Sequence, residues 1–379
     1  MESSLSEMVR DLFPPDPEVA ARQPLLARTD FQSHELYWLD TYEWYRERGY
    51  LLPQRYHPGW LASLVGTGER WQDHEEGYVF KNGFVVDACR DSDNAQVILK
   101  LVRRSVHDQE VEITRHLSTG DIAADPRNHT IQIDDILHHT DHPNIDVIVM
   151  PLLRPFDDPP FDTIGEVVDC IGQIFEGLEF MHSHHVAHRD CHAGNILLDS
   201  RRMYPQGFHP RRKNRTRDLR GRAKHYTRTS RPPRYCLIDF GLSRRYRAED
   251  TNPMEPLIPG GDKTLPETRN RITPCNPFAN DVYYVGNWVR QSFLEGMRGF
   301  GFLAPLIDEM VVDDPSARPS MEQVLLRFNS VKQGLSTWTL RSRAVRVDEG
   351  FVSGLWASVG HWARRIRYVV TRTPALPTP

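Results

Sequence analysis

The stretch His188-Arg189-Asp190-Cys191-His192-Ala193-Gly194-Asn195 combines side chains whose chemistry fits one task. An Asp carboxylate can accept a proton from a hydroxyl, and an Asn amide oxygen five residues later is a ligand that Mg²⁺ accepts. Forty-four residues after Asn195, an apolar strand leads into Asp239-Phe240-Gly241, which supplies a second carboxylate. These are the groups needed to hold magnesium around a phosphoryl group during its transfer.

The chain on either side predicts regular elements that carry these motifs. Apolar positions repeat at helical spacing from Ile164 to Met181 and predict a helix that leads directly into the His188 loop. Further elements are predicted as a strand hairpin at Val85-Val86 and Gln96 to Lys100 around the turn Asp91 to Asn94, a short helix through Glu110, Ile113 and Leu117, and strands at Ile131 to Leu137 and Val147 to Leu153.

Together these motifs resemble the eukaryotic-type protein kinase family over about residues 78 to 330. Lys100 ends a Val-Ile-Leu-Lys strand like the kinase strand whose Lys holds the nucleotide. Pro266-Glu267 resembles the end of the activation segment, and Asp281 to Gly286 and Asp314 to Pro319 resemble later kinase segments. The resemblance implies an α+β, bilobal protein-kinase-like fold, with a small β-rich N-lobe and a larger helical C-lobe.

The predicted organisation has three parts. They are an N-terminal extension at 1–74, a protein kinase-like domain at 75–330 (N-lobe 75–153, C-lobe 154–330, with a basic insertion at 201–235) and a C-terminal tail at 331–379. The extension is rich in Pro, Trp and Tyr and has no sustained period, so we expect it to pack on the first lobe.

The resemblance implies an ATP-dependent protein kinase of the serine/threonine type, with ATP and Mg²⁺ as cofactors and a protein as substrate. Asp190 is then the base, Asn195 and Asp239 hold the metal, and Lys100 binds the α and β phosphates. Its expected partner is Glu110, with Glu112 as a rival. The implied nucleotide-binding residues are Lys100, Val85, Met150, Leu153, Leu197 and Asp239, although Val85 and Leu197 could instead be plain core. Glu267 is expected to pair with Arg318.

Three departures from the family pattern weaken the functional interpretation: the glycine-rich loop, His192, and Ile98 with Thr114. The first and the third suggest an alternative function, a pseudokinase scaffold that binds nucleotide weakly. Gly83 fills the last position of the glycine-rich loop, but Tyr78 and Phe80 stand where its first two glycines belong. His192 replaces the usual Lys, as in the loop of small-molecule kinases such as the aminoglycoside phosphotransferases. Ile98 is bulkier than the usual Ala, and Thr114 is polar at an apolar position.

The insertion at 201–235 is strongly basic, with 13 Lys and Arg against the single Asp218. Its aromatic residues could stack on bases while its cations meet phosphates, which makes nucleic-acid binding a second alternative. The interleaved aromatic residues are Tyr204, Phe208, Tyr226 and Tyr235. We favour a solvated loop that docks on this protein's own acidic surface or on an acidic protein substrate.

At the C-terminal end, apolar residues from Val352 to Val369 share one helical face beside Arg364, Arg365 and Arg367. We expect this face to pack against the rest of the protein, with contact to a membrane surface as the alternative.

The five cysteines are scattered without the spacing of a zinc site or a disulfide framework. No apolar run approaches the roughly 20 residues of a spanning helix, and the first residues do not read as a secretory signal. The expected location is therefore cytoplasmic or nuclear.

Overall fold

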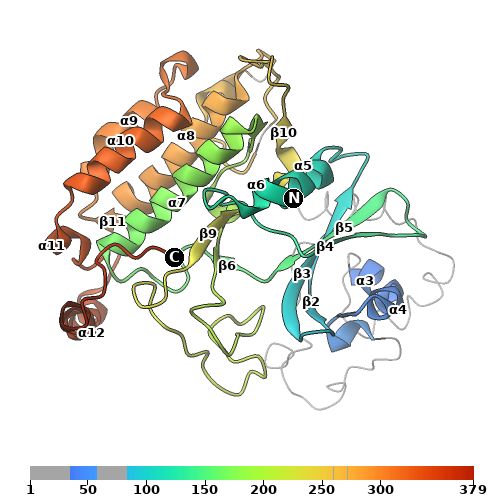
Figure 1. Cartoon of the computed structure of the whole chain (residues 1–379), viewed down its shortest axis with the longest axis horizontal. Helices are drawn as coiled ribbons and strands as arrows, with labels where there is room; N and C mark the ends of the chain where they lie inside the picture. Colours follow the sequence, from blue (N-terminus) through green and yellow to red (C-terminus); the bar gives the residue numbers. More distant parts are fainter. Residues whose placement is uncertain (1–34, 58–82, 259, 271) are drawn as a thin grey trace. The chain divides into compact units, whose positions relative to one another are not determined.

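The computed structural model describes residues 35–57, 83–258, 260–270 and 272–379, which form a mixed α+β structure (Figure 1). The predicted α+β class is thus confirmed for these residues. The chain divides into two compact units, the first made of Met1–Arg103, Ile133–Leu152 and Phe208–Ala223 and the second of Arg104–Gln132, Leu153–Gly207 and Lys224–Pro379. The predicted domain limits stay a prediction, because contacts define compact units and not functional domains.

The first unit is built on a five-stranded antiparallel sheet with the order β1-β2-β3-β5-β4. Its strands are β1 (Tyr50–Leu51), β2 (Val85–Arg90), β3 (Ala95–Arg103), β4 (Asp135–His138) and β5 (Ile145–Pro151). β2 and β3 are the predicted hairpin. The turn between them holds Asn94 at φ 58°, a left-handed conformation that Asn tolerates well.

One predicted strand start is wrong. The strand expected from Ile131 begins only at Asp135, because the Ile131 N–H donates to the Leu237 carbonyl in the second unit instead of joining the sheet. The strand expected over Val147 to Leu153 is found, two residues earlier at each end.

Aromatic residues of the N-terminal extension form the core of the first unit. They come from α3 (Leu36–Asp40), α4 (Tyr42–Glu47) and the residues just after, and they pack on Val97, Leu99 and Leu101 of β3. The Trp38 Nε1 donates to the Gly83 carbonyl at 3.0 Å, which ties this layer to the start of the sheet. The expected packing of the extension is therefore confirmed for the described residues of this segment.

The second unit is mainly helical, and α7 (Ile164–Ser183) runs through its core as the predicted helix, packed against α8 and α10 (Figure 1). Thr163 caps its start by accepting from the Glu166 N–H. The other helices are α5 (Glu110–Leu117), which confirms the predicted short helix, α6 (Gly120–Ala124), α8 (Pro277–Val289), α9 (Ala304–Met310), α10 (Met321–Gly334), α11 (Thr337–Leu340) and α12 (Phe351–Val370).

Short strands hold the loops of the second unit in place. They are β6 (Arg154–Pro155), β8 (Ile196–Asp199) and β9 (Arg234–Leu237) in one sheet, β7 (Val186–Ala187) with β10 (Arg244–Arg245), and β11 (Met297–Arg298) with β12 (Val345–Arg346). β8 begins directly after the His188 loop, and β9 ends at Leu237, two residues before Asp239. Backbone pairing of these strands therefore fixes the two loops that carry the predicted chemistry.

The basic insertion belongs to the folded body of the protein. Within the first unit, Arg211 pairs with Asp87 of β2 at 2.7 Å, and both side chains are largely buried. Within the second unit, buried Thr229 donates to the carboxylate of Glu166 through its N–H at 2.9 Å and its hydroxyl at 2.7 Å. The insertion therefore docks on acidic groups of this protein, as expected, but the expectation of a solvated loop is wrong, because Arg228 and Thr229 are buried.

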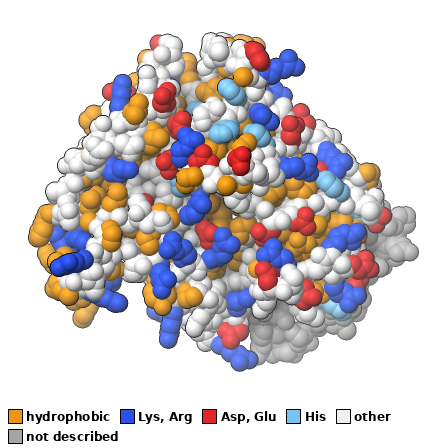
Figure 2. Space-filling view, in the orientation of Figure 1, with side chains coloured by type: hydrophobic (Ala, Val, Ile, Leu, Met, Phe, Trp, Pro, Cys, Tyr) orange, Lys and Arg blue, Asp and Glu red, His pale blue; other side chains and the backbone are white. Residues whose placement is uncertain are grey.

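The expectation for the C-terminal helix is wrong. The apolar face of α12 is exposed, and Figure 2 shows hydrophobic side chains at the surface over this helix, at the lower left. Its polar face packs instead, because Asp162 binds His361 and Arg364 from that side.

All five cysteines are free thiols. Among the described residues, no helix combines the length and apolar character that crossing a membrane requires.

Candidate active site

The backbone of the His188 loop is fixed by one buried carboxylate. Asp281 of α8 accepts from the N–H groups of His188 at 2.7 Å and Arg189 at 2.6 Å, and it also contacts the His182 ring at 3.0 Å. The Ser243 hydroxyl donates to the His188 carbonyl at 2.9 Å. Arg189 is held at φ 67°, a conformation that costs a non-glycine residue energy and that these contacts stabilise. The loop therefore has a defined shape before any ligand binds.

Asp190 and Asn195 form a joined pair. The Asn195 Nδ2 donates to the Asp190 carbonyl at 2.9 Å and to Asp190 Oδ2 at 3.0 Å. Because its nitrogen makes both bonds, the amide oxygen of Asn195 is the atom left for another ligand. An amide oxygen beside a carboxylate is a suitable donor for a hard cation such as Mg²⁺.

Asp239 lies on a loop that is bonded to the Asn195 loop. The Ile238 N–H donates to the Asn195 carbonyl at 3.0 Å, and the His188 Nε2 contacts the Ile238 carbonyl at 3.1 Å. Asp239 itself sits at φ 66° and its carboxylate accepts from the Gly241 N–H at 3.2 Å. The structure thus brings the predicted residues Asp190, Asn195 and Asp239 onto two loops that are bonded to each other.

Glu110 of α5 meets the Asp239 loop at Gly241. A Cβ atom placed on Gly241 would lie 3.1 Å from Asp239 Oδ1 and 3.2 Å from Glu110 Oε2, so both carboxylates lie beside this glycine. The His107 Nδ1 contacts the Gly241 carbonyl at 2.8 Å from the same side. Glu110 is buried and Glu112 is exposed, as expected if Glu110 is the internal residue of the two. Buried Thr114, which departs from the family pattern, donates its hydroxyl to the Glu110 carbonyl at 2.6 Å.

The remaining predicted nucleotide-binding residues divide between the two units. In the first, Val85 is the register partner of Lys100, and Met150 lies two residues from Ile148, the other register partner of Lys100. Side chains of such partners share a sheet face, so Val85, Lys100 and Met150 lie on the face opposite the aromatic core. In the second unit, Leu197 of β8 is the register partner of Pro155, which follows Leu153 by two residues. Tyr78 and Phe80 lie outside the described residues.

A glycine pair that was not predicted to be part of the site contacts Asp190. The Gly261 N–H donates to Asp190 Oδ1 at 2.7 Å. A Cβ on Gly260 would come within 2.3 Å of this carboxylate, and one on Gly261 within 2.3 Å of His192 Nε2. Only glycine permits so close an approach of the backbone. The available signal was the Gly-Gly pair itself, which marks a close contact but not its partner.

His192 stands beside the same carboxylate. Its Nδ1 accepts from the Gly194 N–H at 2.9 Å, and its Nε2 lies 3.5 Å from Asp190 Oδ1. The hydrogen bond with Asp190 raises the pKa of His192 above its ordinary value, and burial opposes this effect. The bond from Gly194 is that of the neutral ring, and protonation would give up this bond while strengthening the contact with Asp190, which is why the pKa is raised.

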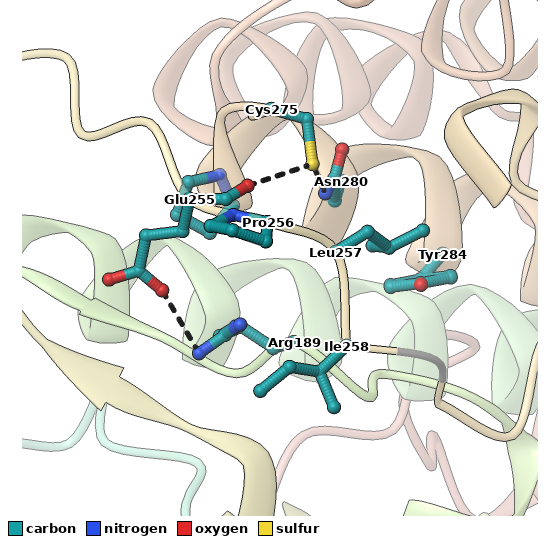
Figure 3. A pocket seen from close by; sticks show the side chains of 9 residues that line it. Arg189, Glu255, Pro256, Leu257, Ile258, Cys275, Asn280 and Tyr284 are labelled. Atoms are coloured by element: carbon teal, nitrogen blue, oxygen red, sulfur yellow. Dashed lines mark hydrogen bonds and ion pairs between the residues drawn. The ribbon is translucent and has the colours of Figure 1, made fainter. Parts of the chain in front are cut away.

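Glu255 neutralises Arg189, the neighbour of Asp190. Its carboxylate lies 3.2 Å from the Arg189 Nη1 (Figure 3). It also lies 2.9 Å from the Nη1 of Arg244. Backbone bonds between Glu255 and Cys275, at 3.1 and 2.8 Å, fix the carboxylate in place. This cluster was not predicted, because no local pattern connects Glu255 to Arg189 over 66 residues.

The predicted pair of Glu267 and Arg318 is confirmed. The guanidinium donates to both carboxylate oxygens, at 2.7 and 3.0 Å, and its Nε donates to the Val312 carbonyl at 3.0 Å. The Arg318 side chain is fully buried and that of Glu267 nearly so. This bidentate pair joins the segment after Asp239 to the turn before α10.

Comparison with known proteins does not identify a family. No protein-family model matches the chain, and a search of curated proteins finds no significant match.

Proposed function

We propose that this chain is an ATP- and magnesium-dependent protein kinase, with a bilobal kinase-like fold, that transfers the γ-phosphoryl group of ATP to a protein hydroxyl. The observation that carries the proposal is the geometry of Asp190, Asn195 and Asp239. Asn195 turns its nitrogen towards Asp190, and the Asp239 loop is bonded to both His188 and Asn195. Residues without a shared function have no physical reason to adopt this arrangement on two loops that are bonded to each other.

Each residue has a role in the proposed reaction. Asp190 accepts the proton of the attacking hydroxyl, and its orientation is set by hydrogen bonds from Asn195 and Gly261. Lys100 binds the α and β phosphates, and Val85, Met150, Leu153 and Leu197 contact the base. Most of the rate then comes from positioning and from charge neutralisation, since phosphoryl transfer asks for little covalent chemistry from the protein.

The donor set fits magnesium bound together with a nucleotide. Asn195 and Asp239 offer one amide oxygen and one carboxylate, and Mg²⁺ in kinases takes its other ligands from phosphates and water. Within the described part of the chain, no cluster of three His, Cys, Asp or Glu side chains could hold a metal ion. We therefore propose that magnesium binds with ATP, whose phosphate charge it neutralises, and not in a separate protein cage.

The contacts of Glu255 favour an enzyme that is active without phosphorylation over one that must first be phosphorylated. Kinase activation loops are commonly ordered by a phosphate that pairs with arginines. In this chain the Glu255 carboxylate already pairs with Arg189 and Arg244. Thr264, which lies in the same segment, uses its hydroxyl to bind Asp262 at 2.8 Å, as a structural residue does.

Two other functions are less well supported. A pseudokinase scaffold is favoured by the Gly261 bond to Asp190, because a backbone group already touches the proposed base. Nucleic-acid binding through the insertion loses most of its physical basis, because Tyr204, Phe208 and Tyr235 are buried and cannot stack on bases. A pseudokinase scaffold would be stabilised by nucleotide but would transfer no phosphate. This difference would separate it from an active kinase.

The test of the proposal is an assay of phosphate transfer from γ-labelled ATP to protein, with magnesium present or removed by EDTA. We expect transfer by the full chain with magnesium and none without it. The Asp239→Ala variant should be inactive under both conditions.

The charge of His192 should appear in the pH dependence of transfer. Because the pKa of His192 is raised, the cationic form persists above the ordinary range and is lost as pH rises through the raised value. The same direction applies to the stability of the fold. The contact between His192 and Asp190 stabilises the folded protein fully below the ordinary pKa of His, and this stabilisation is lost as pH rises through the raised pKa. In the proposal, protonated His192 neutralises phosphate charge, so kcat should fall as pH rises.

The variant His192→Lys should remove this alkaline loss, because a lysine stays protonated up to about pH 10. A charge-assisted hydrogen bond contributes roughly 1.5–3 kcal/mol, so wild-type kcat should fall about tenfold or more on full deprotonation. The measurement is kcat between about pH 6 and 9, the range over which a His titrates. An equal alkaline loss in both proteins would show that another group controls it.

A further inference from the structure

α12 presents its apolar side to the surface. Nine large apolar side chains of this helix are between 50% and 88% exposed. They are Phe351, Val352, Leu355, Trp356, Val359, Trp362, Ile366, Val369 and Val370. At 100° per residue they fall within an arc of about 140°, so they form one continuous stripe, the apolar stripe. Their summed exposed area reaches or exceeds the roughly 300–600 Å² of the largest apolar patch on a typical monomer.

The orientation of α12 is fixed by its opposite side. Asp162 accepts from Arg364 twice at 2.8 Å and contacts His361 at 3.2 Å. The Tyr368 hydroxyl is bonded to Thr227 Oγ1 at 2.6 Å. Burial alone would raise the pKa of Asp162, but the hydrogen bonds from Arg364 and His361 outweigh it and lower the pKa to about 2. The helix is therefore held by its polar side at neutral pH, and the apolar stripe stays outward.

The charge around the apolar stripe is uniformly positive. From Gly350 to Pro379 the sequence has four arginines and no acidic residue. Arg367 borders the stripe and is exposed, and Arg372 follows the end of the helix. The acidic residues just before α12 are neutralised, since Glu349 pairs with Arg343 at 2.7 Å and Asp348 pairs with Arg346 at 2.9 Å.

We propose that α12 docks lengthwise on an anionic lipid surface, with the apolar stripe inserted and the exposed Arg367 and Arg372 against the headgroups. Trp356 and Trp362 carry an apolar ring and an N–H donor, the combination that sits at the boundary between acyl chains and headgroups. Trp338 of α11, 68% exposed beside Arg365, adds a third such ring.

A second copy of the chain fits the stripe less well. A two-fold contact between two α12 helices would bring their uncompensated arginines together, which costs energy. The stripe is also wider than the narrow seam along which two helices interlock. An anionic bilayer supplies both the missing negative charge and an apolar layer wide enough for the whole stripe.

The experiment is co-sedimentation of the full chain with vesicles of phosphatidylcholine and phosphatidylserine at about 7:3, compared with phosphatidylcholine alone. We expect binding to the anionic vesicles that is at least tenfold tighter and that weakens as salt is raised. The double variant Leu355→Glu/Ile366→Glu places two charges at the centre of the stripe and should lower binding at least tenfold. Neither side chain is buried, at 59% and 60% exposure, so the fold should persist.

The matched control is Leu326→Glu on α10, where a leucine is 63% exposed outside α12. It should bind vesicles like the wild-type chain. Equal binding by the double variant, or no binding by the wild-type chain to either vesicle, would overturn the proposal. A wild-type dimer in light scattering that the double variant converts to monomer, without vesicle binding, would overturn it in favour of a second copy.

Discussion

Replacing Asp190 with Asn should lower phosphate transfer roughly 10²- to 10⁴-fold, the usual contribution of a positioned general base. An amide has nearly the size of the carboxylate and can still accept the hydrogen bond from Gly261, but it cannot take a proton. ATP should still stabilise the variant against heat, because Asp190 has no role in holding the phosphates. The measurement is kcat for protein phosphorylation together with the shift in melting temperature on adding MgATP.

The control for this result is Asp218→Asn, the same chemical change at an exposed position of the insertion. It should leave kcat unchanged. Transfer by the Asp190→Asn variant at the wild-type rate would remove Asp190 from the mechanism. Loss of both transfer and nucleotide stabilisation would indicate that the substitution disturbs the loop and not only the proton acceptor.

Removing the Arg318 side chain should cost about 3–5 kcal/mol in the free energy of unfolding, the typical result of leaving one partner of a buried ion pair alone. Arg318 donates to both Glu267 oxygens and to the carbonyls of Val312, Ala279 and Asp313, so Arg318→Ala leaves a nearly buried carboxylate and three carbonyls without this donor. The measurement is urea unfolding of the variant and the wild-type chain.

The matched control is Arg327→Ala, which removes an arginine from an ion pair with Glu309 in which both side chains are about half exposed. An exposed pair contributes at most about 1 kcal/mol. If Arg318→Ala costs no more than Arg327→Ala, the bidentate pair does not hold the segment after Asp239 to the lobe.

The sequence was most informative where the pattern is local. The β2–β3 hairpin, α5 and α7 follow from alternation or helical periodicity over a few turns, and the structure confirms them. The loop from His188 to Asn195 could be located because its residue types and spacing define a chemistry. The pairing of Glu267 with Arg318 could be predicted because a buried carboxylate needs a cation as its partner.

Contacts between distant segments could not be predicted. No local rule connects Gly261 to Asp190 or Glu255 to Arg189, because such contacts depend on where the backbone returns. The face of α12 was predicted wrongly for a different reason: periodicity shows that a helix has two faces but not which one packs. Asp162, nearly 200 residues earlier, decides this by binding His361 and Arg364.

The insertion illustrates a similar limit. Its composition indicates a solvated basic loop, yet Arg228 and Thr229 are buried and Arg228 donates to the Tyr235 hydroxyl at 2.6 Å. The Nη2 of Arg228 donates to the Pro159 carbonyl, and its Nε has no hydrogen-bond partner among the described residues. Composition alone does not reveal such buried contacts.

The most direct test of the proposed kinase is transfer of the γ-phosphoryl group from ATP to protein by the wild-type chain and by Asp239→Ala, with magnesium present. The account predicts incorporation of phosphate by the wild-type chain and a loss of at least about 10²-fold in the variant, since one group that stabilises transition-state charge contributes on that scale. No incorporation by the wild-type chain, or equal incorporation by both proteins, would contradict it.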